Sequence, residues 1–164
     1  LADVADSMGG WTREQRLAIL HDHRIGSYGA TALALSLLSR AVLLAELPIE
    51  RFIAYTVSAH VLCRWSMLPL SYYLPPARES EGQGARIARL TSTASLITGS
   101  IFTIATVAVT LRRAAIGPVL AAIVVPLLSS WFYMRKFGGV TGDCFGATNQ
   151  LTEIAVYLCG VWKA

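Results

Sequence analysis

Residues 1–30 read LADVADSMGGWTREQRLAILHDHRIGSYGA and stand directly before a chain that turns almost wholly apolar. The stretch holds Asp3, Asp6 and Asp22, which are three of the ten acidic residues. In a helix, side chains three residues apart project from one face, so Asp3 and Asp6 would lie side by side. Two carboxylates held that close repel each other, and a divalent cation such as Mg²⁺ relieves the repulsion. The pattern is that of a metal site, although the same spacing also occurs on ordinary solvated helix faces.

The composition is that of a membrane protein rather than of a soluble domain. Hydrophobic residues make up 54% of the 164 residues and charged residues only 15%, and the mean hydropathy is +0.53. The formal net charge is +4, but the basic residues are scattered and form no patch interleaved with aromatic residues, so no nucleic acid is expected as a partner. Three widely spaced cysteines without a CxxC pair indicate neither a disulfide framework nor a zinc site.

Five apolar segments have about the length of membrane-spanning helices, so the chain is predicted to be all-α, a polytopic membrane helical bundle. The segments are residues 29–47, 52–74, 90–111, 118–134 and 147–161. Residues 1–164 are expected to form a single domain, in which residues 1–28 lie at the surface and residues 29–164 form the bundle.

A short amphipathic helix is predicted to precede the bundle. Thr12 and Gln15 form a capping-box pattern that starts this helix, which should run through about His23 along the membrane surface. Its basic residues are expected near lipid phosphates or an anionic substrate; they are Arg13, Arg16 and Arg24.

Basic residues fall unequally on the two sides of the predicted bundle. The richer side carries the amino-terminal segment and the loops at 75–89 and 135–145, and the excess of positive charge makes that side cytoplasmic. The acidic residues of both ends of the chain emerge on this face; they are Asp3, Asp6, Asp22 and Asp143. We therefore expect the two acidic motifs, residues 1–28 and 138–153, to meet at one cytoplasmic site.

Polar residues near or inside the predicted spans require partners. A charge inside a span costs roughly 2.5 to 3.5 kcal/mol, so Arg64 should face the bundle interior, unless it snorkels to a headgroup. Glu153 should pair with Arg64 or Arg40, bind substrate or be protonated, and Asn149 would share its face. Asp143 lies in the glycine-rich run GGVTGDCFGA, where it either contributes to a phosphate-binding loop or caps the following helix.

Two of these stretches resemble signatures of the cobalamin synthase family, the membrane-bound adenosylcobinamide-GDP ribazoletransferases. One is LADVADSMGG with RLAILHDHRIGSYGA, and the other is GGVTGDCFGATNQLTE at 138–153. RWSMLPLSYYLPPARESEGQGA, between them, is also similar to the family. The first family signature reads Asp-Gly-Leu-Ala-Asp-x-x-Asp, then Asp-x-Arg-Ile-Gly-Ser-x-Gly. The matching residues are Leu1, Ala2, Asp3, Asp6, Asp22, Arg24, Ile25, Gly26, Ser27 and Gly29. The Asp-Gly expected before Leu1 is absent, so the chain is interpreted as a fragment.

The resemblance implies a Mg²⁺-dependent transferase that performs the last assembly step of cobalamin. The acceptor would be the 5′-hydroxyl of α-ribazole (or its 5′-phosphate), the group under attack would be the diphosphate of adenosylcobinamide-GDP, and GMP would leave. The implied metal ligands are Asp3, Asp6 and Asp143, and the implied catalytic residues are Asp22 and Asp143. The implied substrate-binding residues are Arg24, Ser27, Arg64, Asn149 and Glu153.

The resemblance also implies the surroundings of the protein. Its partners would be the corrinoid nucleotide, α-ribazole and the lipid bilayer, and a homo-oligomer or a complex with other cobalamin-assembly enzymes stays open. The implied location is the bacterial inner membrane, with several crossings and the active site facing the cytoplasm.

Three alternatives remain at this point. A CDP-alcohol-phosphotransferase-like enzyme also uses clustered aspartates in a membrane, but this chain lacks that family's Asp-Gly-x-x-Ala-Arg run. A small transporter would place charges near midspan between broken helices, which Arg64 and Glu153 allow, whereas the aspartates cluster at loop ends. The third alternative is that the chain, as a fragment, is inactive on its own.

Overall fold

The computed structural model describes residues 1–22, 24–77 and 91–162, and within these residues the chain is helical and contains no strand. The all-α prediction is therefore confirmed. The elements are α1 (Ala2–Asp6), η1 (Ser7–Gly9), α2 (Arg13–Ile19), α3 (Ser27–Glu46), α4 (Ile49–Trp65), α5 (Met67–Tyr73), α7 (Thr93–Leu111), η2 (Arg112–Ala115), α8 (Ile116–Phe137) and α9 (Gly142–Trp162).

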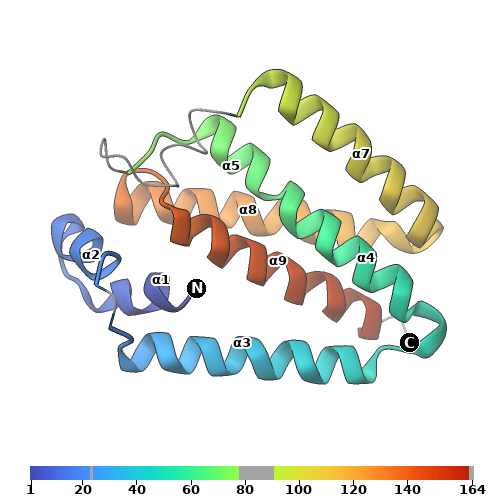
Figure 1. Ribbon diagram of the computed structural model, residues 1–164, viewed down its shortest axis with the longest axis horizontal. Helices are drawn as coiled ribbons and strands as arrows, with labels where there is room; N and C mark the ends of the chain where they lie inside the picture. Colours follow the sequence, from blue (N-terminus) through green and yellow to red (C-terminus); the bar gives the residue numbers. More distant parts are fainter. Residues whose placement is uncertain (23, 78–90, 163–164) are drawn as a thin grey trace.

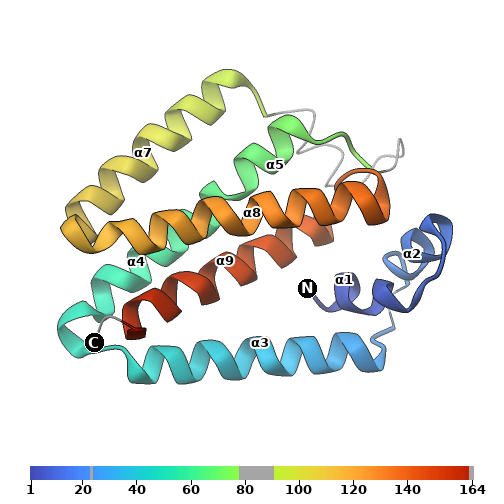
Figure 2. The same cartoon turned by 180° about the vertical axis from the view of Figure 1, so that it is seen from behind.

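α9 is the central helix of the bundle. In both views it runs between α3 on one side and α4 and α8 on the other (Figures 1 and 2). Its buried face repeats every four residues through Thr148, Thr152, Val156 and Gly160, and such small or β-branched side chains let neighbouring helices approach closely. A Cβ on Gly160 would lie 2.6 Å from Leu47 Cδ2. The close fit at this glycine shows why the last helix in the sequence occupies the middle of the fold.

Two apolar clusters hold the bundle, one toward each end of α9. The first joins the short amino-terminal helices to α8 and the start of α9 through Val4, Leu17, Phe137 and Phe145. The second joins α4, α7, α8 and the end of α9; its largest fully buried members are Tyr55 and Tyr157. The first cluster fixes the position of α1, which carries the first acidic motif.

Two segments of the described chain are long and apolar enough to cross a membrane, Ser27–Glu46 and Thr93–Phe137. Only 11% and 22% of their most apolar windows are buried, whereas a core helix of a soluble protein is mostly buried. The second segment reverses direction at Arg112, whose φ is 49°, so that α7 and α8 form a hairpin (Figure 1). The membrane character is thus supported, but the predicted number of five crossings is not confirmed.

The prediction of one continuous helix over residues 52–74 is wrong. α4 ends at Trp65 and α5 begins at Met67, with Ser66 between them. Pro69 has no N–H to donate to the carbonyl of Trp65, and its ring crowds that carbonyl. The Ser66 hydroxyl instead donates to the carbonyl of Cys63 at 2.7 Å. The break follows from the proline, a feature that was visible in the sequence.

The surface helix begins where the sequence predicted and ends earlier. The hydroxyl of Thr12 accepts a hydrogen bond from the backbone N–H of Gln15. The side-chain oxygen of Gln15 in turn accepts one from the backbone N–H of Thr12, so the capping box is confirmed. α2 ends at Ile19 rather than near His23, which lies outside the described residues, as do residues 78–89 of the predicted loop and residue 90 of the predicted third span.

Candidate active site

Asp3 and Asp143 come together where α1 contacts the first turn of α9. Burial raises the pKa of Asp143, and the nearby charge of Asp3 raises that pKa further. These two carboxylates belong to the two acidic motifs and lie 140 positions apart in the sequence. The structure thus brings one carboxylate of each motif together, and their shared role in one site stays a prediction.

Asp6, predicted to be a metal ligand beside Asp3, is bound by the backbone of α3. Its Oδ2 accepts from the N–H of Gly26 and its Oδ1 from the N–H of Gly29, both at 2.8 Å. A Cβ at Gly29 would lie 2.1 Å from Oδ2, and one at Gly26 2.4 Å from Oδ1. The glycines of the RIGSYG run thus make room for the carboxylate, and the helix N-terminus stabilises its charge. Through these two hydrogen bonds, Asp6 attaches α1 to the start of α3.

The glycine pair at 138–139 sets the position from which α9 starts. Gly138 ends α8 in the left-handed region with a φ of 71°, which glycine adopts without a steric penalty. A Cβ on Gly139 would lie 2.4 Å from the carbonyl oxygen of Pro75. Val140 exchanges two backbone hydrogen bonds of 2.9 Å with the same segment, one to the Pro75 carbonyl and one from the Ala77 N–H. The loop before Asp143 is therefore anchored by the chain that follows α5.

Arg13 ties the surface helix to this loop. Its Nε donates to the carbonyl of Phe137 at 2.6 Å, and its Nη2 donates to the carbonyl of Ala77 at 3.0 Å. These two donors are therefore occupied by the last turn of α8 and the segment after α5, and the expectation that Arg13 lies near lipid phosphates or an anionic substrate stays a prediction. Sequence reasoning had no signal for this partner, since the two carbonyls lie far along the chain.

Tyr133 holds the first turn of α9 in place. This buried residue of α8 donates its hydroxyl to the carbonyl of Cys144 at 3.0 Å and lies 3.0 Å from the hydroxyl of Thr148. Because Cys144 follows Asp143 directly, Tyr133 is a positioning residue for that carboxylate. A tyrosine within an apolar span requires a hydrogen-bond partner, and that was the one signal available in the sequence.

Asp22 and Arg24, predicted as a catalytic and a substrate-binding residue, pair with each other at the surface. The Arg24 guanidinium donates to both carboxylate oxygens of Asp22, with a shortest distance of 3.0 Å. Hydrogen bonding to Asp22 raises the pKa of Arg24. Ser27 begins α3, exposed, one position after the Gly26 that binds Asp6. The three residues face solvent, and their roles in substrate chemistry stay predictions.

Glu153 lies deeper in the bundle and pairs with Arg40, as the sequence allowed. Arg40 Nη1 is 3.4 Å from Glu153 Oε2, the Tyr157 hydroxyl donates to Oε1 at 3.3 Å, and His60 Nδ1 lies 3.9 Å from Oε1. Arg64 is exposed and donates to the carbonyl of His60 at 3.0 Å. The interior position predicted for Arg64 is therefore wrong, and Glu153 is satisfied by protein groups.

Asn149 carries an unused polar atom. Its Oδ1 is buried and has no hydrogen-bond partner among the described residues. A buried acceptor without a donor costs about 1 to 3 kcal/mol, so a donor at this oxygen would stabilise the structure. The predicted substrate-binding role of Asn149 fits that observation and is untested.

Residues 1–161 match the family model described as cobalamin-5-phosphate synthase. The chain belongs to this family. Similar curated relatives are named adenosylcobinamide-GDP ribazoletransferase. That of Mesorhizobium japonicum is 41% identical over 167 residues, covering 96% of this chain and 61% of the relative. That of Albidiferax ferrireducens is 35% identical, covering 96% of this chain and 65% of the relative. The chain thus spans less than two thirds of their length. No solved structure matches it.

Two facing carboxylates in this member of the cobalamin-5-phosphate synthase family fit a Mg²⁺ site. Among the described residues no group of three or more His, Cys, Asp or Glu side chains is placed to hold a metal ion. Mg²⁺, however, is commonly bound through one or two carboxylates together with water and substrate phosphates. The raised pKa of Asp143 beside Asp3 shows the repulsion that such a cation would relieve. Asp3 and Asp143 therefore fit the ion, whereas Asp6 is engaged elsewhere.

Proposed function

We propose that the chain forms the phosphoryl-transfer site of an adenosylcobinamide-GDP ribazoletransferase, which joins adenosylcobinamide-GDP to α-ribazole or its 5′-phosphate and releases GMP. The observation that carries the proposal is the pairing of Asp3 with Asp143 at the junction of α1 and α9. The names of the relatives agree with this reaction.

Mg²⁺ bound at this pair would neutralise charge on the diphosphate of the substrate, which is the main requirement of phosphoryl transfer. Asp3 and Asp143 would hold the ion, and Tyr133 keeps Asp143 in place through the carbonyl of Cys144. Asp3 lies on the short helix α1, which Asp6 attaches to α3, and Asp143 lies in the first turn of the central helix α9, so the carboxylates meet the substrate already oriented.

The exposed residues before and at the start of α3 would act on the acceptor, α-ribazole or its 5′-phosphate. Asp22 would accept the proton of a ribose hydroxyl of the ribazole, whose oxygen forms a bond to the phosphorus that carries cobinamide. The bond from that phosphorus to the GMP oxygen breaks, and GMP leaves with the electron pair. Arg24, now paired with Asp22, would turn toward the phosphate oxygens, and Ser27 and Asn149 supply further polar contacts.

In this proposal the protein crosses the bacterial inner membrane several times, and α3, α4 with α5, α7, α8 and α9 are the crossings. The carboxyl end of α8, with Arg135 and Lys136 in its last turn, lies at the same end of the bundle as α1 and the start of α9 (Figure 1). The positive residues favour the cytoplasmic side for this end. A homo-oligomer, or a complex with other cobalamin-assembly enzymes, would be tested by the mass of the purified particle.

The test is release of GMP from adenosylcobinamide-GDP and α-ribazole by membranes carrying the protein, with and without Mg²⁺. We expect release that requires Mg²⁺ and falls by at least about 100-fold in Asp3→Asn and in Asp143→Asn. Glu50→Gln, an exposed carboxylate in the first turn of α4, is the matched control and should keep its activity. Release that is absent in folded wild-type protein, or unchanged in both aspartate variants, would overturn the proposal.

A further inference from the structure

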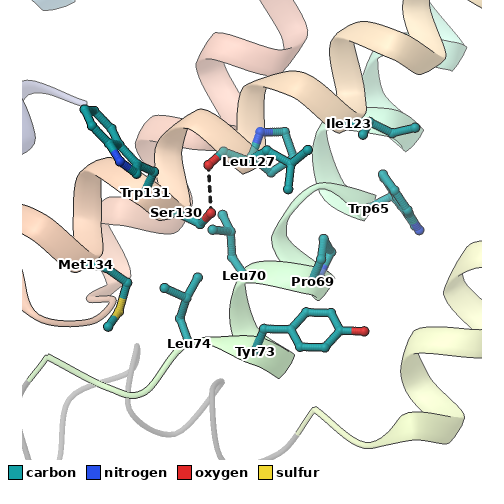
Figure 3. A pocket seen from close by; sticks show the side chains of 11 residues that line it. Trp65, Pro69, Leu70, Tyr73, Leu74, Ile123, Leu127, Ser130, Trp131 and Met134 are labelled. Atoms are coloured by element: carbon teal, nitrogen blue, oxygen red, sulfur yellow. Dashed lines mark hydrogen bonds between the residues drawn. The ribbon is translucent and has the colours of Figure 1, made fainter.

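An open groove of about 440 Å³ runs along the outside of the bundle between α5 and α8. Figure 3 shows Pro69 and Tyr73 of α5 on one wall and Leu127, Ser130 and Trp131 of α8 on the other. The α8 wall extends from Ile123 to Met134, eleven residue rises or roughly 16 Å of helix. The groove is therefore extended along α8, and its length suits a linear chain.

The groove offers an occupant almost no polar contact along its length. The hydroxyl of Ser130 donates to the carbonyl of Leu127 in its own helix at 2.8 Å, the dashed line in Figure 3. The walls are open to the outside, since Leu127 is 62% and Trp131 59% exposed. Both belong to Thr93–Phe137, one of the two segments apolar enough to cross a membrane. In a bilayer this groove faces the hydrocarbon.

Positive charge is placed at one end of the groove. The guanidinium carbon of Arg135 lies 4.7 Å from the centre of the Trp131 ring, and Lys136 is the next residue in the last turn of α8. Arginine stacked on an exposed tryptophan is typical of the boundary between hydrocarbon and headgroups. The carbonyl end of the helix also favours cations at this position.

We propose that the groove binds an anionic phospholipid, with an acyl chain along α8 and the headgroup phosphate at Arg135 and Lys136. One molecule with a linear apolar tail and a single anionic head matches both the length of the groove and the charge at one end of it. Each basic residue next to an apolar surface raises the affinity for an anionic lipid about fivefold. The site is separate from the Asp3 and Asp143 pair and does not depend on the proposed reaction.

The test is lipid binding to the purified protein in detergent, followed by native mass spectrometry with phosphatidylglycerol and phosphatidylcholine of identical acyl chains. We expect phosphatidylglycerol to bind roughly thirtyfold more tightly. The double variant Arg135→Gln/Lys136→Gln should lose that preference. Ser130→Phe, which fills the groove, should weaken both lipids. Arg112→Gln/Arg113→Gln, at the far end of α8, is the matched control and should bind as wild type.

A second measurement needs no substitution in the groove. Phosphatidylglycerol brominated on its acyl chain should quench the fluorescence of Trp65 and Trp131, which line the groove, more strongly than brominated phosphatidylcholine at equal concentration. Equal binding of the two lipids would overturn the proposal. So would a preference that survives Arg135→Gln/Lys136→Gln, or a dimer that Ser130→Phe dissociates, since the occupant would then be a second copy of the chain.

Discussion

Asp6 and Asp143 are both carboxylates of the acidic motifs, yet the structure treats their charges in opposite ways. Asp6 receives two backbone N–H groups at the start of α3, each at 2.8 Å. Asp143 is half-buried and faces Asp3, and its pKa is raised by burial and by that neighbour. The first charge is stabilised by fixed donors of the protein, whereas burial and the charge of Asp3 outweigh the backbone hydrogen bond that stabilises the second, which is therefore suited to a cation.

This difference separates a carboxylate that holds helices together from a carboxylate that is suited to chemistry. The Asp6 contact holds α1 against α3, and that attachment places Asp3 where α9 presents Asp143. Replacing a carboxylate that the fold needs should therefore lower the free energy of unfolding. Replacing a carboxylate that the reaction needs should change that free energy little, or raise it, when no metal is bound.

Gly29→Ala should have the largest effect, because its Cβ would lie 2.1 Å from Asp6 Oδ2 and would displace the carboxylate from both N–H groups. We expect a loss of about 3 kcal/mol or more in the free energy of unfolding, measured by chemical denaturation in mild detergent. The matched control is Gly146→Ala in α9, where a Cβ meets nothing within 4 Å. Alanine there should raise stability by up to about 1 kcal/mol; similar losses for both variants would contradict the role of Asp6.

Asp6→Asn should cost about 2 kcal/mol of stability, with or without Mg²⁺. One amide oxygen can replace only one of the two acceptors, and the amide NH₂ would then face a backbone N–H donor. The same denaturation experiment measures the loss. A variant as stable as wild type in metal-free buffer, but unable to respond to Mg²⁺, would return Asp6 to the set of metal ligands.

Mg²⁺ should stabilise the wild-type protein through Asp3 and Asp143. At a concentration ten times its dissociation constant, the ion adds about 1.4 kcal/mol to the free energy of unfolding. The shift should be absent in Asp143→Asn and retained in Asp22→Asn. Equal shifts in wild type and Asp143→Asn would place the ion elsewhere.

Asp143→Asn should have the smallest effect on the free energy of unfolding, and of the opposite sign. Without metal we expect a gain of less than about 1 kcal/mol, because solvent screens this half-exposed pair. A raised pKa means that the folded state favours the protonated carboxyl. The contribution of Asp143 is therefore present below its ordinary value of 3.8 and lost as the pH rises through the raised pKa. Wild-type stability should fall across that window relative to Asp143→Asn; parallel pH curves would contradict the pairing.

The sequence predicted much of the architecture because the signals were local or followed from topology. The Thr12 capping box starts α2 as expected, and the order of apolar segments brought the motifs of Asp3 and Asp143 to one end of the bundle. Pro69 is equally visible in the sequence, but the apolar run continues through it, so apolarity alone did not predict the helix break at Ser66.

The site could be predicted only in part, because spacing shows which side chains share a face and not what they meet. Asp3 and Asp6 looked alike, and only the fold shows that Gly26 and Gly29 present their N–H groups to one of them. The partners of Arg13 are backbone carbonyls, which leave no residue pattern to recognise.

The most direct test of a shared site is a double-mutant cycle on Mg²⁺ affinity, measured by calorimetry on Asp3→Asn, Asp143→Asn and the combination. If both carboxylates hold one ion, each single change should remove most of the affinity and the double variant should be little worse than either. Losses that add fully in the double variant would mean that the two aspartates act independently, and the account of one site built from both ends of the chain would be wrong.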